Sequence, residues 1–131
     1  WLWRVDAPLA TADMRTKAGD DYAARVYLSF RIAPEALGLG TRAKLALARS
    51  IYGDQVPDAA LNYVWDNRQP VGTMMPNAYT DRTRMIVLRS GTGDAGGWVI
   101  ERRDVADDFE RAFGEVPAQL SGIALASDTD N

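Results

Sequence analysis

The sequence predicts a mainly β fold, a β-sandwich of jelly-roll type with two short helices in the connections between strands. Six segments show the alternating or β-branched pattern of strands, whereas only two place their apolar residues at helical spacing. A doubly wound sheet needs a helix after nearly every strand, so the balance of elements disfavours that fold. The alternative is an α+β layer with both helices on one face of the sheet.

The first two predicted strands are separated by a long loop. Residues 1–5 alternate with bulky side chains and predict a strand that starts without a leading turn. Residues 6–21 are rich in Ala, Thr, Asp and Gly and predict a loop, and loops of this length are commonly functional. Residues 22–32 give the clearest strand, and Pro34 ends it. The apolar face of that strand carries Val26, Leu28, Phe30 and Ile32.

The middle of the chain alternates a helix, a strand and a loop. Residues 41–52 predict a short amphipathic helix that ends at Gly53. Residues 61–65 alternate large and small side chains, which indicates a strand. Residues 71–82 contain Gly, Pro and Asn without a sustained period, so we expect a loop there.

Residues 84–103 predict a β-hairpin. Residues 84–89 are short and rich in β-branched side chains, and residues 98–103 follow as a returning strand. The four glycines of residues 91–97 can adopt positive φ, which suits a hairpin connection longer than two residues.

A capped helix and a last strand complete the chain. Asp104 is placed as the N-cap, and Val105 and Phe109 lie on the face expected to be buried. Gly114 is a natural end for this helix. Residues 120–127 then alternate small and branched side chains and predict the final strand.

Composition excludes several classes of function. A chain of 131 residues is long enough for one domain, residues 1–131, with its own core. The absence of cysteine and histidine excludes disulfides, thiolate metal sites and Ser-His-Asp catalysis within the chain. A net charge of -3 without a basic half argues against a nucleic-acid partner. No apolar run has the length of a membrane span.

Two groups of charged residues are candidate binding sites. Lys17, Asp20, Asp21 and Arg25 meet where the first loop enters a strand, and their carboxylates could hold a metal or a sugar hydroxyl. The plainer interpretation is an ion-paired turn. Asp128, Asp130 and Asn131 repeat oxygen ligands at alternate positions, as calcium loops do, although the pattern also fits a frayed terminus.

These two groups are expected to share one rim, since loops gather at the ends of a sandwich. Carboxylates brought together in this way repel one another. Lys17, Arg25 or a bound calcium ion must then compensate their charge.

Aromatic side chains and one further ion pair complete the candidate ligand-binding set. Trp65 and Tyr79, like Tyr63 and Trp98, could stack on a sugar ring, although core packing is the stronger explanation for each of them. Glu101 could serve as an acid or base but also fits an exposed strand pair, and Arg89 completes the set.

Five blocks of the sequence resemble the bacterial family called domain of unknown function 3047. They are KAGDDYAARVY at residues 17–27, YVW at 63–65, RMIVLRSG at 84–91, ERRDV at 101–105 and DTDN at 128–131. The resemblance implies an exported, periplasmic or secreted β-sandwich of galactose-binding-like shape, and it implies no established activity. It also implies further strands on both sides, so we expect a domain that is incomplete at both ends.

The leading functional hypothesis is a non-catalytic envelope module that binds a carbohydrate or a similar polar ligand. The alternatives are a carboxylate- or tyrosine-dependent lyase or glycoside hydrolase and a structural assembly module. Two carboxyl groups facing each other across a cleft would favour an enzyme, whereas an open groove with an exposed aromatic ring would favour a binder. Unprotected strand edges also predict a homodimer.

Overall fold

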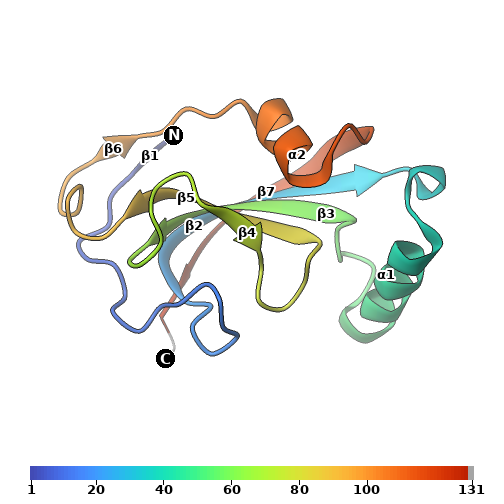
Figure 1. The fold of residues 1–131 in the computed structure, drawn as a ribbon, viewed down its shortest axis with the longest axis horizontal. Helices are drawn as coiled ribbons and strands as arrows, with labels where there is room; N and C mark the ends of the chain where they lie inside the picture. Colours follow the sequence, from blue (N-terminus) through green and yellow to red (C-terminus); the bar gives the residue numbers. More distant parts are fainter. Residues whose placement is uncertain (130–131) are drawn as a thin grey trace.

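A computed structural model describes residues 1–129 and shows a twisted five-stranded sheet with a small two-stranded sheet above it (Figure 1). The large sheet has the order β4-β5-β3-β2-β7, and the small one pairs β1 with β6. All neighbours are antiparallel except β3 and β5, which are parallel. The strands are β1 (Leu2–Trp3), β2 (Tyr22–Ile32), β3 (Ala59–Asp66), β4 (Met74–Pro76), β5 (Thr83–Ser90), β6 (Val99–Ile100) and β7 (Ala118–Asp128). The helices are the 3₁₀ helix η1 (Pro34–Ala36), α1 (Leu39–Tyr52) and α2 (Val105–Phe113).

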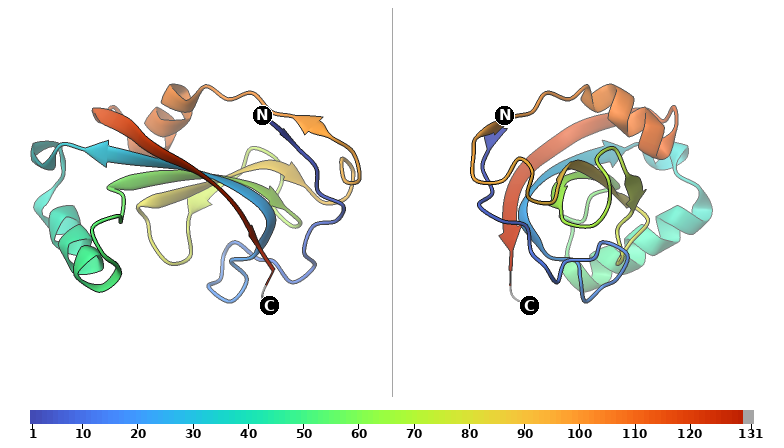
Figure 2. Two further views of the ribbon diagram at one scale, coloured as in Figure 1. Left: turned by 180° about the vertical axis from the view of Figure 1, so that it is seen from behind. Right: turned by 60° about the vertical axis from the view of Figure 1, so that its left-hand side comes forward.

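Strand β2 lies between β3 and β7, and its bounds agree with the sequence prediction. Alternate residues of a strand point to opposite faces of the sheet, so the two faces have different cores, and a register shift after Tyr22 separates this residue from the other apolar residues of β2. On one face the apolar residues of β2 pack with Trp3, Val5 and Phe109 from the segments above the sheet. On the other face Met14, from the loop before β2, packs against Tyr22 and a second set of buried residues. Figure 2 shows that this loop lies on the side of the sheet away from β1 and β6.

The predicted capped helix is confirmed as α2. The side chain of Asp104 accepts a hydrogen bond from the backbone N–H of Asp107 at 3.1 Å, as an N-cap does. Phe109 is buried, and Gly114 ends the helix with a positive φ of 82° that an L side chain rarely adopts. Helix α1 was also predicted, and it starts two residues earlier than expected. It lies beyond the end of the sheet, and Leu45 is its buried residue.

The predicted hairpin of residues 84–103 is wrong. The glycine loop does not return the chain beside β5. Instead, the backbone N–H of Gly96 donates to the carbonyl of Val5 at 2.8 Å, and β6 pairs with β1 in the second sheet. Strand β5 pairs with β3 and β4, so both of its edges are occupied within the large sheet. Contacts between residues that are far apart in the sequence therefore determine where residues 98–103 lie, and the local hairpin pattern does not.

Residues 71–82 were predicted to form only a loop, and this is corrected by β4 within them. Met74 and Met75 pair with β5, and Pro76 ends this short strand at the edge of the sheet. The broad prediction, a mainly β fold with two sheets and helices in the connections, is confirmed. The jelly-roll type stays a prediction. No helix among residues 1–129 is long and apolar enough to cross a membrane.

Candidate functional site

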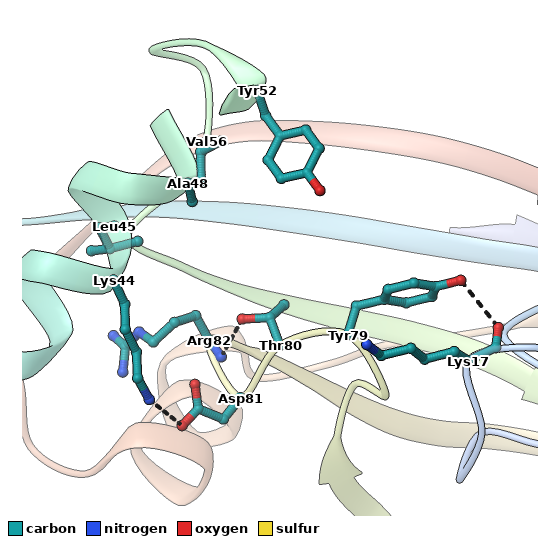
Figure 3. Close-up of a pocket in the computed structure, with 10 residues that line it drawn as sticks. All are labelled: Lys17, Lys44, Leu45, Ala48, Tyr52, Val56, Tyr79, Thr80, Asp81 and Arg82. Atoms are coloured by element: carbon teal, nitrogen blue, oxygen red, sulfur yellow. Dashed lines mark hydrogen bonds and ion pairs between the residues drawn. The ribbon is translucent and has the colours of Figure 1, made fainter. Parts of the chain in front are cut away.

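An open pocket of about 830 Å³ lies between α1 and the loop that leads into β5 (Figure 3). Its far side is formed by Lys17, from the loop before β2. The pocket has an apolar wall from α1 and a polar wall from the two loops. Its lining residues are Lys17, Lys44, Leu45, Ala48, Tyr52, Val56, Tyr79, Thr80, Asp81 and Arg82.

Two tyrosine rings stand at this pocket with much of their surface in solvent. Tyr52 ends α1 and is 75% exposed, and Tyr79 is 63% exposed. The Tyr79 hydroxyl donates to the backbone carbonyl of Lys17 at 3.2 Å, and the Lys17 ammonium lies 5.4 Å from the ring centre. These two contacts hold Tyr79 in place although the residue belongs to an exposed loop. A fixed, exposed ring is the kind of surface on which a sugar ring stacks.

The charges at the pocket are mostly positive. Lys44 lies 3.9 Å from Asp81, and both side chains are more than half exposed, so solvent weakens this pair. The Nε of Arg82 donates to the backbone carbonyl of Asp58 at 2.9 Å, and the guanidinium carbon lies 5.1 Å from the ring centre of Phe113 in α2, so two contacts fix this side chain. Burial lowers the pKa of Arg82, but an arginine remains charged at neutral pH.

Hydrogen bonds and one longer ion pair join the pocket to the charged residues predicted from the sequence. The Asn77 side chain accepts from the backbone N–H of Tyr79 at 2.9 Å and donates to Asp20 at 3.1 Å. Asp20 in turn lies 3.6 Å from Arg25, which donates to Asp128 at 3.0 Å. Residues about a hundred positions apart thus meet at one rim.

The expected proximity of Asp20 and Asp128 is confirmed, and Arg25 supplies the compensating charge. The Arg25 side chain is only 8% exposed and lies over the Tyr22 and Tyr27 rings. Burial raises the pKa of Asp20; Arg25 opposes the rise, and the nearby Asp128 carboxylate adds to it. Arginine is therefore the cation that the structure places between the two carboxylates.

The metal hypothesis was built on residues that the structure describes only in part. Asp128 takes part in the Arg25 ion pair, whereas Asp130 and Asn131 lie outside the described residues. Within residues 1–129, no group of three or more acidic side chains could hold a metal ion. Asp21, the other acidic residue of the first group, is buried at 5% exposure.

The other predicted binding residues lie elsewhere and are held by the protein itself. Glu101 accepts from Arg89 at 2.7 Å and from the Trp3 indole at 3.1 Å, and its side chain is only 9% exposed. Glu101 was expected on an exposed strand, and its burial between the two sheets corrects that expectation. Trp65 is 1% exposed and donates to the Gly91 carbonyl at 3.1 Å, so it belongs to the core. The Glu101–Arg89 contact ties the segment after β6 to β5, and the Trp65–Gly91 contact ties the glycine loop to β3.

Of the residues that line the pocket, sequence reasoning named only Lys17 and Tyr79 as site residues, and it missed among others Lys44, Tyr52 and Arg82, as well as the neighbouring Asn77. Tyr52 was assigned to the apolar face of its helix, and no local signal shows that this end of α1 extends past the sheet. A cue was present in the loop, since Tyr79, Asp81 and Arg82 fall within four positions of one another.

Comparison with known proteins identifies the family but no characterised relative. The family model described as "Protein of unknown function (DUF3047)" matches residues 1–131. No curated protein and no solved structure matches the chain. The match covers the whole chain and agrees with the resemblance seen in the sequence, so the chain belongs to the DUF3047 family.

Proposed function

We propose that this chain is a non-catalytic module of the bacterial envelope that binds a carbohydrate or a similar polar ligand. The ligand binds in the pocket between α1 and the loop that leads into β5, which carries Tyr79 and is called the Tyr79 loop below. The observation that carries the proposal is the pair of exposed rings, Tyr52 and Tyr79, at a pocket of about 830 Å³. Such a pocket is large enough for a small ligand, and sites of this kind combine ring surface with a few polar groups. A periplasmic or secreted location is part of the proposal, and its support is the family resemblance.

The carboxylates at the pocket favour binding over hydrolysis. Glycoside hydrolases use two carboxyl groups roughly 5 to 10 Å apart. Among the described residues that line the pocket, Asp81 is the one carboxylate, and it pairs with Lys44. Trp98 is 70% exposed but does not line the pocket. The enzyme alternative predicts product release from a polysaccharide, which a reducing-sugar assay and the ultraviolet absorbance of an unsaturated product would detect.

Binding to an oligosaccharide panel tests the proposal, with Tyr79→Ala and Tyr52→Ala as variants. Each substitution is expected to raise the dissociation constant of a bound oligosaccharide about tenfold or more, which corresponds to about 1.4 kcal/mol of binding free energy. Trp98→Ala is the matched control, because it removes an exposed ring outside the pocket. Isothermal titration calorimetry measures the affinities. Equal losses in all three variants, or no binding to any member of the panel, would contradict the proposed site.

We also propose that the chain forms a homodimer through β7. This strand of 11 residues pairs with β2 on one edge, and no strand within residues 1–129 pairs with its other edge. Natural edge strands are usually short or carry charge and proline. The opposite edge of the sheet is guarded in this way, because β4 has three residues and ends in Pro76. Residues 118–127 carry no charge, and Leu120, Ile123 and Leu125 are exposed.

Strand β7 has the features needed to pair with a second copy of itself, and Ile123→Lys should therefore weaken the dimer. A lysine on the edge opposes strand pairing, so we expect at least a tenfold rise in the dimer dissociation constant, or about 1.4 kcal/mol. Light scattering over a dilution series measures it. Leu47→Lys, at another exposed apolar position, is the control. A wild-type chain that is monomeric at all concentrations would contradict the dimer.

Three narrower hypotheses remain as proposals. A jelly-roll or galactose-binding-like relationship is supported by the presence of two sheets, and a structural assembly role is supported by the uncharged edge of β7. Calcium near Asp128 is supported by the oxygen-rich sequence that begins there. A melting temperature that rises with calcium concentration would support the calcium site, and an unchanged one would contradict it.

A further inference from the structure

The chain is acidic overall, yet the pocket between α1 and the Tyr79 loop is basic. The net charge of the protein is -3, whereas the pocket is lined by three cations and one carboxylate. The chain contains only two lysines, and both line this pocket. Because positive charge is concentrated against the sign of the whole protein, the local field at the pocket favours an anionic ligand.

The cations at the pocket have no strong carboxylate partner among the described residues. Among residues 1–129, neither Lys17 nor Arg82 forms an ion pair with a carboxylate. Lys44 has Asp81 as its partner at 3.9 Å, but exposed pairs of this kind contribute about 0 to 1 kcal/mol. An incoming anion therefore does not have to break a strong internal ion pair.

The arrangement of these groups matches a sugar that carries an acidic substituent. Figure 3 shows Lys44, Asp81 and Arg82 together on one side of the pocket and Tyr79 with Lys17 on the other. A sugar ring over Tyr79 would have cations on both sides. Lysine and arginine N–H groups form their strongest hydrogen bonds with carboxylate and sulfate oxygens, and the guanidinium can present two parallel donors.

We propose that the pocket selects acidic oligosaccharides, whose carboxylate or sulfate group binds at Lys44 and Arg82 while a sugar ring lies on Tyr79. This inference rests on the proposed carbohydrate-binding function and adds the class of sugar. Uronic acids and sulfated sugars share the required negative charge. Binding must be sensitive to salt, because the cations are close to solvent and ions screen such charges.

A matched pair of probes tests the selectivity. Calorimetry of the full chain with hexagalacturonate and with the methyl ester of the same hexamer compares a charged ligand with a neutral one of equal length. We expect the acid to bind at least about tenfold more tightly at low salt, and the difference to shrink as salt is added. A sulfated galactan hexamer shows whether the pocket recognises sulfate as well as carboxylate groups. A pocket that selects carboxylates would bind this hexamer no more tightly than it binds the methyl ester.

Variants locate the charge recognition. Lys44→Met is expected to lower the affinity for hexagalacturonate several-fold and to leave the affinity for its methyl ester unchanged. Arg42→Met removes a positive charge from the same helix outside the pocket and should change neither affinity. Equal binding of both hexamers, or equal effects of both variants, would overturn the acidic selectivity while leaving carbohydrate binding intact. Failure of charged and neutral sugars alike to bind would overturn the proposed function and this inference together.

Discussion

Phe109→Ala is expected to lower the free energy of unfolding by about 3 to 5 kcal/mol, the range for truncation of a buried phenylalanine. Phe109 is 6% exposed and is one of two α2 residues that are buried. Its ring centre lies 4.6 Å from that of Phe30 in β2 and 5.1 Å from that of Phe113. The substitution removes both ring contacts and leaves a cavity between α2 and the sheet. Single domains are stable by about 5 to 15 kcal/mol, so this loss unfolds a large share of a marginal protein.

Urea denaturation followed by circular dichroism measures this loss. Leu47→Ala is the matched control, because Leu47 lies on a helix and is 63% exposed, and we expect a change of at most about 0.5 kcal/mol. If Phe109→Ala unfolds at nearly the same urea concentration as the wild type, α2 does not stabilise the sheet as its packing indicates.

Elements with local signals could be predicted from the sequence. Strand β2 alternates apolar and polar side chains and ends before Pro34, and its predicted bounds are those of the structure. Helix α2 was recognised because Asp104 and Gly114 are strong start and stop residues. In both cases neighbouring residues suffice to specify the conformation.

Pairings between distant segments could not be predicted in the same way. The parallel pairing of β3 and β5 and the pairing of β1 with β6 join segments whose sequences carry no mark of their partner. Residues 98–103 were strand-like and followed a glycine loop, so a hairpin was the natural local solution. In the structure, residues 99–100 of this segment pair instead with the N-terminal strand β1.

The candidate site was predictable where topology constrained it. Asp20 and Asp128 were expected at one rim because loops collect at the ends of sheets, and Arg25 joins them there. Lys44, Tyr52 and Arg82 could not be found this way. Their meeting depends on the position of α1 beyond the end of the sheet, which no residue of the helix specifies.

The buried carboxylate of Asp108 carries the second large expected effect. Asp108 is 1% exposed, accepts from the Tyr63 hydroxyl at 2.6 Å and receives two hydrogen bonds from Arg103, at 2.9 and 2.6 Å. Asp108→Asn leaves these donors facing an amide that can satisfy only some of them. Breaking a buried ion pair costs about 3 to 5 kcal/mol, and we expect the lower end because Arg103 can recover some water. Tyr63→Phe removes a single donor to the charged carboxylate and should cost about 1.5 to 3 kcal/mol.

The pH dependence distinguishes this ion pair from a simple packing defect. Burial acts to raise the pKa of Asp108, but the hydrogen bonds from Arg103 and Tyr63 outweigh it and hold the pKa below its ordinary value. The unfolded chain therefore takes up the proton first as the pH falls. The stabilisation is complete above about pH 4, the ordinary aspartate pKa, and is lost as the pH drops through the lower pKa of the folded state. Urea denaturation at neutral pH and near pH 3 measures the free energy of unfolding of the wild type and of Asp108→Asn. We expect the difference in free energy between the two proteins to shrink in acid. The control is Asp107→Asn, at an exposed neighbour, which should differ little from the wild type at neutral pH. A difference for Asp108→Asn that stays constant with pH would mean that the charge of Asp108 does not stabilise the fold.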